Sequence, residues 1–107
     1  LLRAKNLAQK TPDMVQFNEE LLKEGVEKDL YYKYREVEEI TKKDFTNKEY
    51  VKAMKEIVTL KEYVDNYLDN IVIMVDDKRV RNNRLALLQN VSDIVQPVID
   101  LEEITLD

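Results

Sequence analysis

The chain has 107 residues, of which 44% are hydrophobic and 36% are charged, and its net charge is −5. This length suits one domain with a single core, and the apolar content excludes a disordered chain. The sequence contains no cysteine, no histidine and a single glycine, so we expect no disulfide, no thiolate metal site, no imidazole catalysis and no many-stranded sheet. No apolar run of about 18 residues is present, so no membrane span is expected either.

The first part of the chain is predicted to hold one short helix and a connecting segment. Residues 1–9 place apolar side chains at helical spacing, and Pro12 ends the pattern because it lacks a backbone N–H and restricts the residue before it. Residues 14–23 show no clean period, and we interpret them as a connection with one helical turn after Asn18, whose side chain suits a cap. The chain begins at Leu1 without an initiator methionine, so we expect a domain excised from a longer protein.

Two long amphipathic helices are predicted over residues 26–43 and 48–70. Apolar residues recur there every three or four positions, which is typical of a helix with one buried face. The connection is short, so the two helices should pack as an antiparallel hairpin, with Thr46 or Asn47 as the N-cap of the second. The predicted buried faces contain Val26, Leu30, Tyr34, Val37 and Ile40, then Tyr50, Val51, Met54, Ile57, Val58, Leu60, Val64, Leu68 and Ile71.

A short apolar run follows the hairpin. Residues 71–75 are mostly β-branched, as in a buried strand, but no partner strand is evident, so we interpret them as the end of a helix entering a buried loop. The pair Asp76-Asp77 follows, and either acid suits the positive N-terminal end of a last helix over residues 78–100. Pro97 lies inside that helix and is expected to kink it or to end it near Val95.

The last helix completes the predicted core. Its apolar stripe consists of Val80, Leu87, Val91, Ile94, Val95 and Val98. Stripes of this kind joined by short turns predict an all-α fold, a compact bundle of four or five helices with no sheet. We expect the segment 78–96 to lie across the hairpin.

Cationic residues gather at the start of this last helix. Residues 78–91 contain Lys78, Arg79, Arg81 and Arg84 and no acid, although the whole chain is acidic. Local potential decides where a polyanion docks, so the first three cations, which lie off the apolar stripe, are candidates for phosphate contact; the alternative is an ordinary solvated face. Arg84 lies on the stripe, and a buried arginine needs an acidic partner. The candidate partners are Asp65, Asp69, Asp76 and Asp77.

Asn82 and Asn83 stand among these cations and are poor helix formers so close to a helix start. Asparagine side chains can bind the edges of unpaired RNA bases. The alternative role for both is capping or hydrogen bonding between helices. The pair Asp76-Asp77 is a weak candidate for a metal ion because no oxygen-rich loop surrounds it, and we expect neither a metal nor another cofactor.

Residues 62–85 resemble the C-terminal part of the β subunit of glycyl-tRNA synthetase, in the bacterial two-subunit form of that enzyme. The matching residues are Val64-Asp65, Tyr67-Leu68-Asp69, Ile71-Val72-Ile73-Met74 and Asp76-Asp77, followed by Arg81, Asn83, Arg84 and Leu85. Tyr63 and Leu68 stand where the family usually has proline and phenylalanine, and these departures affect packing more than the motif. Weaker matches near Asn6 and Asn18 extend the resemblance over most of the chain.

The resemblance implies a helical anticodon-binding domain over residues 1–107, of the type shared with arginyl-tRNA synthetase. In that family the α subunit holds the aminoacylation site and the β subunit grips the tRNA. The domain would then have no chemistry of its own and would serve an ATP-dependent glycine–tRNA ligase in the cytoplasm. The expected partners are the anticodon arm of glycine tRNA, the remainder of the β subunit and the α subunit, without membrane or DNA. The expected RNA contacts are Lys78, Arg79, Arg81, Asn82 and Asn83, with Arg84 either structural or in contact with RNA.

A second interpretation treats the chain as a helical docking or scaffold domain that binds another protein. The acidic net charge favours this interpretation, whereas the motif over residues 62–85 favours RNA binding. The two hypotheses are separated by whether the basic side chains of residues 1–10 and 78–84 converge on one face of the fold.

Overall fold

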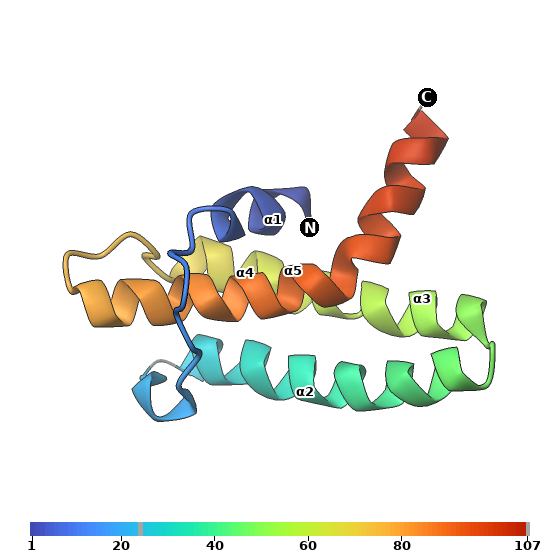
Figure 1. Ribbon diagram of the computed structural model, residues 1–107, viewed down its shortest axis with the longest axis horizontal. Coiled ribbons are helices and arrows are strands. Elements are labelled where there is room, and N and C mark those ends of the chain that lie inside the picture. The colour runs from blue at the N-terminus through green and yellow to red at the C-terminus, as the bar shows by residue number, and fades with distance from the viewer. Residues whose placement is uncertain (24, 107) are drawn as a thin grey trace.

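The computed structural model describes residues 1–23 and 25–106, except for the side chains of residues 102–106. Within these ranges the chain forms five α-helices and one short 3-10 helix and has no strand, so the predicted all-α fold is confirmed (Figure 1). The elements are α1 (Leu2–Ala8), η1 (Glu19–Leu21), α2 (Gly25–Thr46), α3 (Tyr50–Val58), α4 (Leu60–Asn70) and α5 (Lys78–Leu106). No helix of the described part combines the length and the apolar character needed to cross a membrane.

The helices are arranged around an antiparallel pair. α2 packs against both α3 and α4, which follow one another back along it, while α5 packs against α1 and α3 (Figure 1). The predicted hairpin is therefore confirmed, with a break at Thr59 between α3 and α4. Three residues of its predicted buried face, Tyr50, Val51 and Val58, are exposed, so this part of the prediction is wrong. The Thr59 hydroxyl donates to the Glu56 carbonyl at 2.6 Å, a local bond that competes with the next helical turn.

The turn between α2 and α3 differs from the prediction. α2 continues to Thr46, whose hydroxyl donates to the Lys42 carbonyl at 2.9 Å, so Thr46 belongs to the first helix and does not cap the second. Lys48 adopts a left-handed conformation with φ of 60°, which reverses the chain, and α3 begins at Tyr50 with no side-chain cap. The Thr46 or Asn47 cap was therefore a wrong prediction, because the turn is closed by its backbone.

α5 is the central helix of the core. The predicted stripe is confirmed, since Leu87, Val91 and Val95 are fully buried. However, the four consecutive residues 85–88 are all buried, and successive side chains on a helix point in directions about 100° apart. A helix covered on one side cannot bury all four. α5 is therefore enclosed by α1, α2 and α3 together.

Pro97 bends α5 without ending it. The helix runs from Lys78 to Leu106 with Pro97 inside it, and Figure 1 shows its C-terminal part turning sharply away from the first part. Proline removes one backbone hydrogen bond and its ring displaces the preceding turn, which accounts for the bend. The kink is confirmed, and the alternative of an end near Val95 is wrong because Val98 and Ile99 are held by burial in the core.

Candidate nucleic-acid interface

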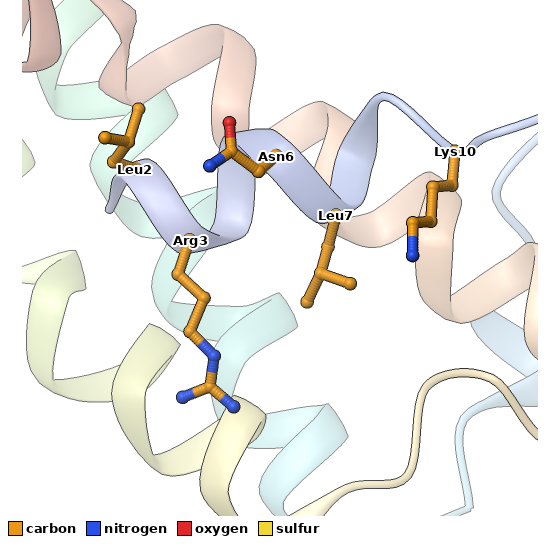
Figure 2. A pocket seen from close by; sticks show the side chains of 5 residues that line it. All are labelled: Leu2, Arg3, Asn6, Leu7 and Lys10. Atoms are coloured by element: carbon orange, nitrogen blue, oxygen red, sulfur yellow. The ribbon is translucent and has the colours of Figure 1, made fainter.

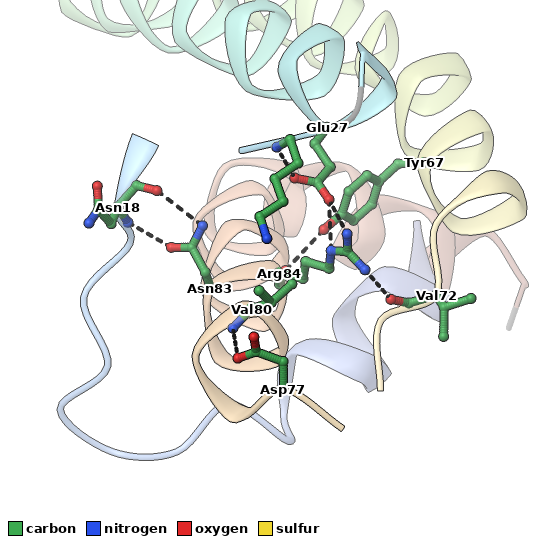
Figure 3. Close-up of polar contacts among 9 residues, drawn as sticks. Asn18, Glu27, Tyr67, Val72, Asp77, Val80, Asn83 and Arg84 are labelled. Atoms are coloured by element: carbon green, nitrogen blue, oxygen red, sulfur yellow. Dashed lines mark hydrogen bonds and ion pairs between the residues drawn. The ribbon is translucent and has the colours of Figure 1, made fainter. Parts of the chain in front are cut away.

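The N-terminus of α5 is fixed by the second acid of the Asp76-Asp77 pair. The Asp77 carboxylate accepts a hydrogen bond from the backbone N–H of Arg79 at 3.0 Å. It accepts another from the backbone N–H of Val80 at 3.2 Å (Figure 3). An acid at this position satisfies free N–H groups and complements the positive end of the helix dipole, so the predicted cap is confirmed. The cap leaves the side chains of Lys78 and Arg79 exposed on the first turn.

Arg81 is half-buried, unlike the two cations before it. Its Nη1 donates to the carbonyl of Val75 at 3.2 Å, which ties the side chain to the loop of residues 71–77. Asn82 is also half-buried. Of the three predicted phosphate contacts, Lys78 and Arg79 are therefore open to solvent, whereas Arg81 also has a role in holding the loop.

Arg84 forms a buried ion pair with Glu27, at the start of α2. The Nε and Nη2 atoms of Arg84 lie 2.7 and 2.6 Å from Oε1 of Glu27, and the two side chains are 11% and 2% exposed (Figure 3). The need for an acidic partner was predicted correctly, but the partner was not. All four aspartates that were considered are exposed, whereas Glu27 points inward from the first turn of α2.

The same pair joins three parts of the chain. Arg84 Nη1 donates to the Val72 carbonyl at 2.6 Å, and Glu27 Oε2 accepts from the backbone N–H of Lys23 at 3.1 Å. Tyr67 lies against the pair and donates from its hydroxyl to the Arg84 carbonyl at 3.4 Å. Burial raises the pKa of the Tyr67 phenol, and the negative charge of Glu27 raises it further, against a lowering by Arg84.

Asn83 holds the connection between α1 and α2. Its Oδ1 accepts from the backbone N–H of Asn18 at 2.7 Å, and its Nδ2 donates to the Asn18 carbonyl at 3.0 Å (Figure 3). Asn83 is buried, so these bonds correspond to the structural alternative considered for it. Asn18 also caps the short helix η1 as predicted, accepting from the N–H of Glu20 at 3.0 Å.

The loop of residues 71–77 alternates between buried and exposed side chains. Ile71 and Ile73 are buried, whereas Val72 is 68% exposed and Met74 is 51% exposed. The loop forms no ladder, so the prediction that residues 71–75 are not a strand is confirmed. The prediction that they form the end of a helix entering a buried loop is wrong, because α4 ends at Asn70 and two of the five side chains are exposed. One face of the loop is therefore buried in the core, and the opposite face is open to solvent.

The N-terminal segment contacts α4 through Arg3 and α5 through Thr11. A shallow groove of about 500 Å³ runs along one face of α1, lined by Leu2, Arg3, Asn6, Leu7 and Lys10 (Figure 2). Arg3 points to the end of α4, where its Nη1 lies 3.4 Å from Oδ1 of Asp69. Next to Lys10, the Thr11 hydroxyl donates to the Leu85 carbonyl at 3.2 Å. The C-terminal end of residues 1–10 therefore lies beside α5, whereas Arg3 lies against α4.

Comparison with known proteins identifies the family. Residues 1–105 match the model of the DALR anticodon binding domain. The chain belongs to this family. It is similar to the glycine–tRNA ligase beta subunit of Halothermothrix orenii, with 45% identity over the whole chain, and to those of Persephonella marina and Aquifex aeolicus, with 36% and 38% identity over 83% of the chain. The resemblance carried by residues 62–85 is thus confirmed. The chain spans 16% of the Halothermothrix protein and 13% and 12% of the other two.

Sequence reasoning missed three features of this region. The burial of Glu27 was not predicted, although its place beside Val26 in the first helical turn of α2 was a signal. The pairing of Asn83 with Asn18 joins residues 65 apart and leaves no local signal. The outward side chains of Val72 and Met74 left no signal either, because residues 71–75 are continuously apolar and show no alternation with polar residues.

Proposed function

We propose that this domain binds the anticodon arm of glycine tRNA through the start of α5. The observation that carries the proposal is the exposed cationic first turn, Lys78 and Arg79, in a segment without acids, on a domain of an anticodon-binding family. The net charge of −5 does not oppose this, because an RNA backbone responds to the local potential of the surface that it approaches. Lys78 and Arg79 contact phosphates, and Arg81 contributes with the part of its guanidinium that does not hold Val75.

The asparagines have different roles in this proposal. Asn82 binds a base edge in the anticodon loop, since its side chain is half-buried at the rim of the cationic turn. The amide oxygen and nitrogen of Asn83 are both hydrogen-bonded to Asn18, so Asn83 stabilises the start of α5 and does not contact RNA. Arg84 is engaged by Glu27 and Val72 and likewise supports the surface.

The whole protein of which this domain is a part would ligate glycine to its tRNA. The relatives are named glycine–tRNA ligase beta subunit, and they are several times longer than this chain. In the proposal the reaction takes place on an α subunit in the cytoplasm, and the remainder of the β subunit carries this domain. The domain itself supplies RNA affinity and no catalytic group.

Salt-dependent binding tests the proposal. Each phosphate contact on single-stranded RNA contributes about −0.7 to the slope of log affinity against log salt concentration. Replacing Lys78 and Arg79 with alanine should flatten the slope by about 1.4 and weaken binding of the anticodon stem-loop. Lys42→Ala with Lys43→Ala is the matched control, since it removes two exposed adjacent cations from the end of α2. Equal slopes for the parent and the Lys78/Arg79 variant would contradict the proposal.

A second candidate function is docking on another protein, and one observation favours it. Val51, Met54, Val58, Val98 and Leu101 line an apolar groove between α3 and the bent part of α5, with Val51 71% exposed. Exposed apolar surface of this kind often marks a protein contact. Protein docking would become the favoured function if the parent chain showed no affinity for the stem-loop. The two functions are compatible because they use different surfaces.

A further inference from the structure

The loop of residues 71–77 presents two apolar side chains to solvent on a fixed backbone. Its inner side chains, Ile71 and Ile73, are buried in the core. Two carbonyls of the loop accept hydrogen bonds from α5, that of Val72 from Arg84 at 2.6 Å and that of Val75 from Arg81 at 3.2 Å. Exposed Val72 and Met74 therefore occupy defined positions and not those of a fluctuating loop.

We propose that Val72 and Met74 form an apolar contact surface for unpaired bases of the bound RNA. This inference rests on the proposed function and adds base contacts to its phosphate contacts. Bases of single-stranded RNA are splayed out and present flat apolar faces, which proteins contact with little dependence on sequence. Methionine suits such a contact because its side chain is flexible and polarisable.

The charges around the loop favour a base over a phosphate at this position. Asp76 is exposed in the same loop and repels a phosphate, whereas an uncharged base can lie against the neighbouring apolar side chains. The exposed cations Lys78 and Arg79 follow the loop directly at the start of α5, so both surfaces lie on one short stretch of chain. Phosphates and bases of one unpaired segment would thus find separate, adjacent surfaces.

The location also favours RNA over a protein partner. The loop is fixed by Arg81 and Arg84, which belong to the same helical segment as the exposed cations. The larger apolar surface, with Val51 and Val58, lies on α3, a helix that takes no part in the cationic turn. A protein partner would be expected on α3, which leaves Val72 and Met74 for the RNA.

Affinity and salt dependence measured together test the inference. In the 107-residue chain, Val72→Ser with Met74→Ser should weaken binding of the glycine tRNA anticodon stem-loop on the order of tenfold, because two apolar contacts are lost. The salt slope should not change, because no phosphate contact is removed. Binding of a fully paired RNA duplex should be unaffected, and the thermal midpoint should stay the same because both side chains are already exposed.

Val51→Ser with Val58→Ser is the matched control, since these side chains are 71% and 48% exposed, close to the 68% and 51% of the tested pair. The control should bind the stem-loop like the parent. If the parent binds and the Val72/Met74 variant binds equally well, the inference is wrong while the proposed function stands. A changed salt slope, or an equal loss in the control, would also overturn it. If the parent does not bind the stem-loop, the proposed function and this inference both fail.

Discussion

The side-chain amide of Asn83 forms two hydrogen bonds with the backbone of Asn18, 65 residues earlier in the chain. The amide pairs with both the N–H and the C=O of Asn18, which belongs to no regular helix or sheet that would satisfy both. It thereby fixes the irregular connection between α1 and α2 onto the first turns of α5. The next two residues of α5 continue this pattern, since Arg84 holds Glu27 and Val72 and the Leu85 carbonyl accepts from Thr11.

Replacing Asn83 with alanine should destabilise the domain by about 1–3 kcal/mol, because it leaves the part-buried N–H of Asn18 without a partner and removes one hydrogen bond from its C=O. A urea melt measures the change. Asn82→Ala removes the same amide from a half-buried neighbour and should cost under about 0.5 kcal/mol. Equal midpoints for the two variants would show that the Asn83 bonds contribute nothing.

Replacing one member of the Glu27–Arg84 pair should cost more than replacing both. Arg84→Met or Glu27→Met alone leaves a buried charge without its partner, at about 3–5 kcal/mol. The double variant fills the same space with apolar atoms and should cost less than the sum of the two. A double-mutant cycle in urea measures the coupling, expected above about 1 kcal/mol. Additive losses would mean that water compensates each charge.

Residues on the buried faces of α5 should matter to stability, and the exposed cation should not. Leu88→Ala and Val91→Ala remove fully buried side chains and should each cost about 1–5 kcal/mol. Arg79→Ala lies on the exposed first turn and should cost under about 0.5 kcal/mol. The same urea melts compare them, and a similar loss for all three would mean that the exposed turn is part of the core.

Alkaline pH should destabilise the domain through Tyr67. Burial and the nearby Glu27 charge raise its pKa in the folded state, so the unfolded chain releases the phenolic proton first. The free energy of unfolding is then unaffected below the ordinary tyrosine pKa of about 10 and falls as pH rises above it. Tyr67→Phe should reduce this fall in urea melts at a series of alkaline pH values. The remainder is expected from Tyr34, because burial and its hydrogen bond to Glu38 also raise the pKa of that phenol.

Much of the fold could be predicted because its signals are local. The stripes of α2 and α5, the cap at Asp77 and the kink at Pro97 all depend on residues within one or two helical turns. The turn between α2 and α3 was mispredicted because Lys48 adopts a left-handed backbone conformation. Lysine rarely adopts this conformation, so the residue type at position 48 gave no sign of it.

The site was less predictable because its contacts join distant segments. That Arg84 needs an acid follows from its place on an apolar stripe, but choosing Glu27 required knowing how α2 meets α5. The burial of Asn83 likewise depends on where the segment around Asn18 meets α5. The exposed cations Lys78 and Arg79 could be placed from the sequence because the helical period alone determines which side of α5 they occupy.

The enclosure of residues 85–88 has a consequence for how the domain opens. These four side chains point in different directions around a helix that packs against α1, α2 and α3, so detaching any single element exposes only part of the segment. Their backbone amides should therefore exchange with solvent only when the whole domain unfolds, at a rate set by its global free energy. Native-state hydrogen exchange would then find the slowest amides in the middle of α5, with faster exchange toward both ends of the helix. The helix that carries the cationic turn would be mobile at its exposed start and immobile one turn later, where Arg84 and Leu85 enter the core.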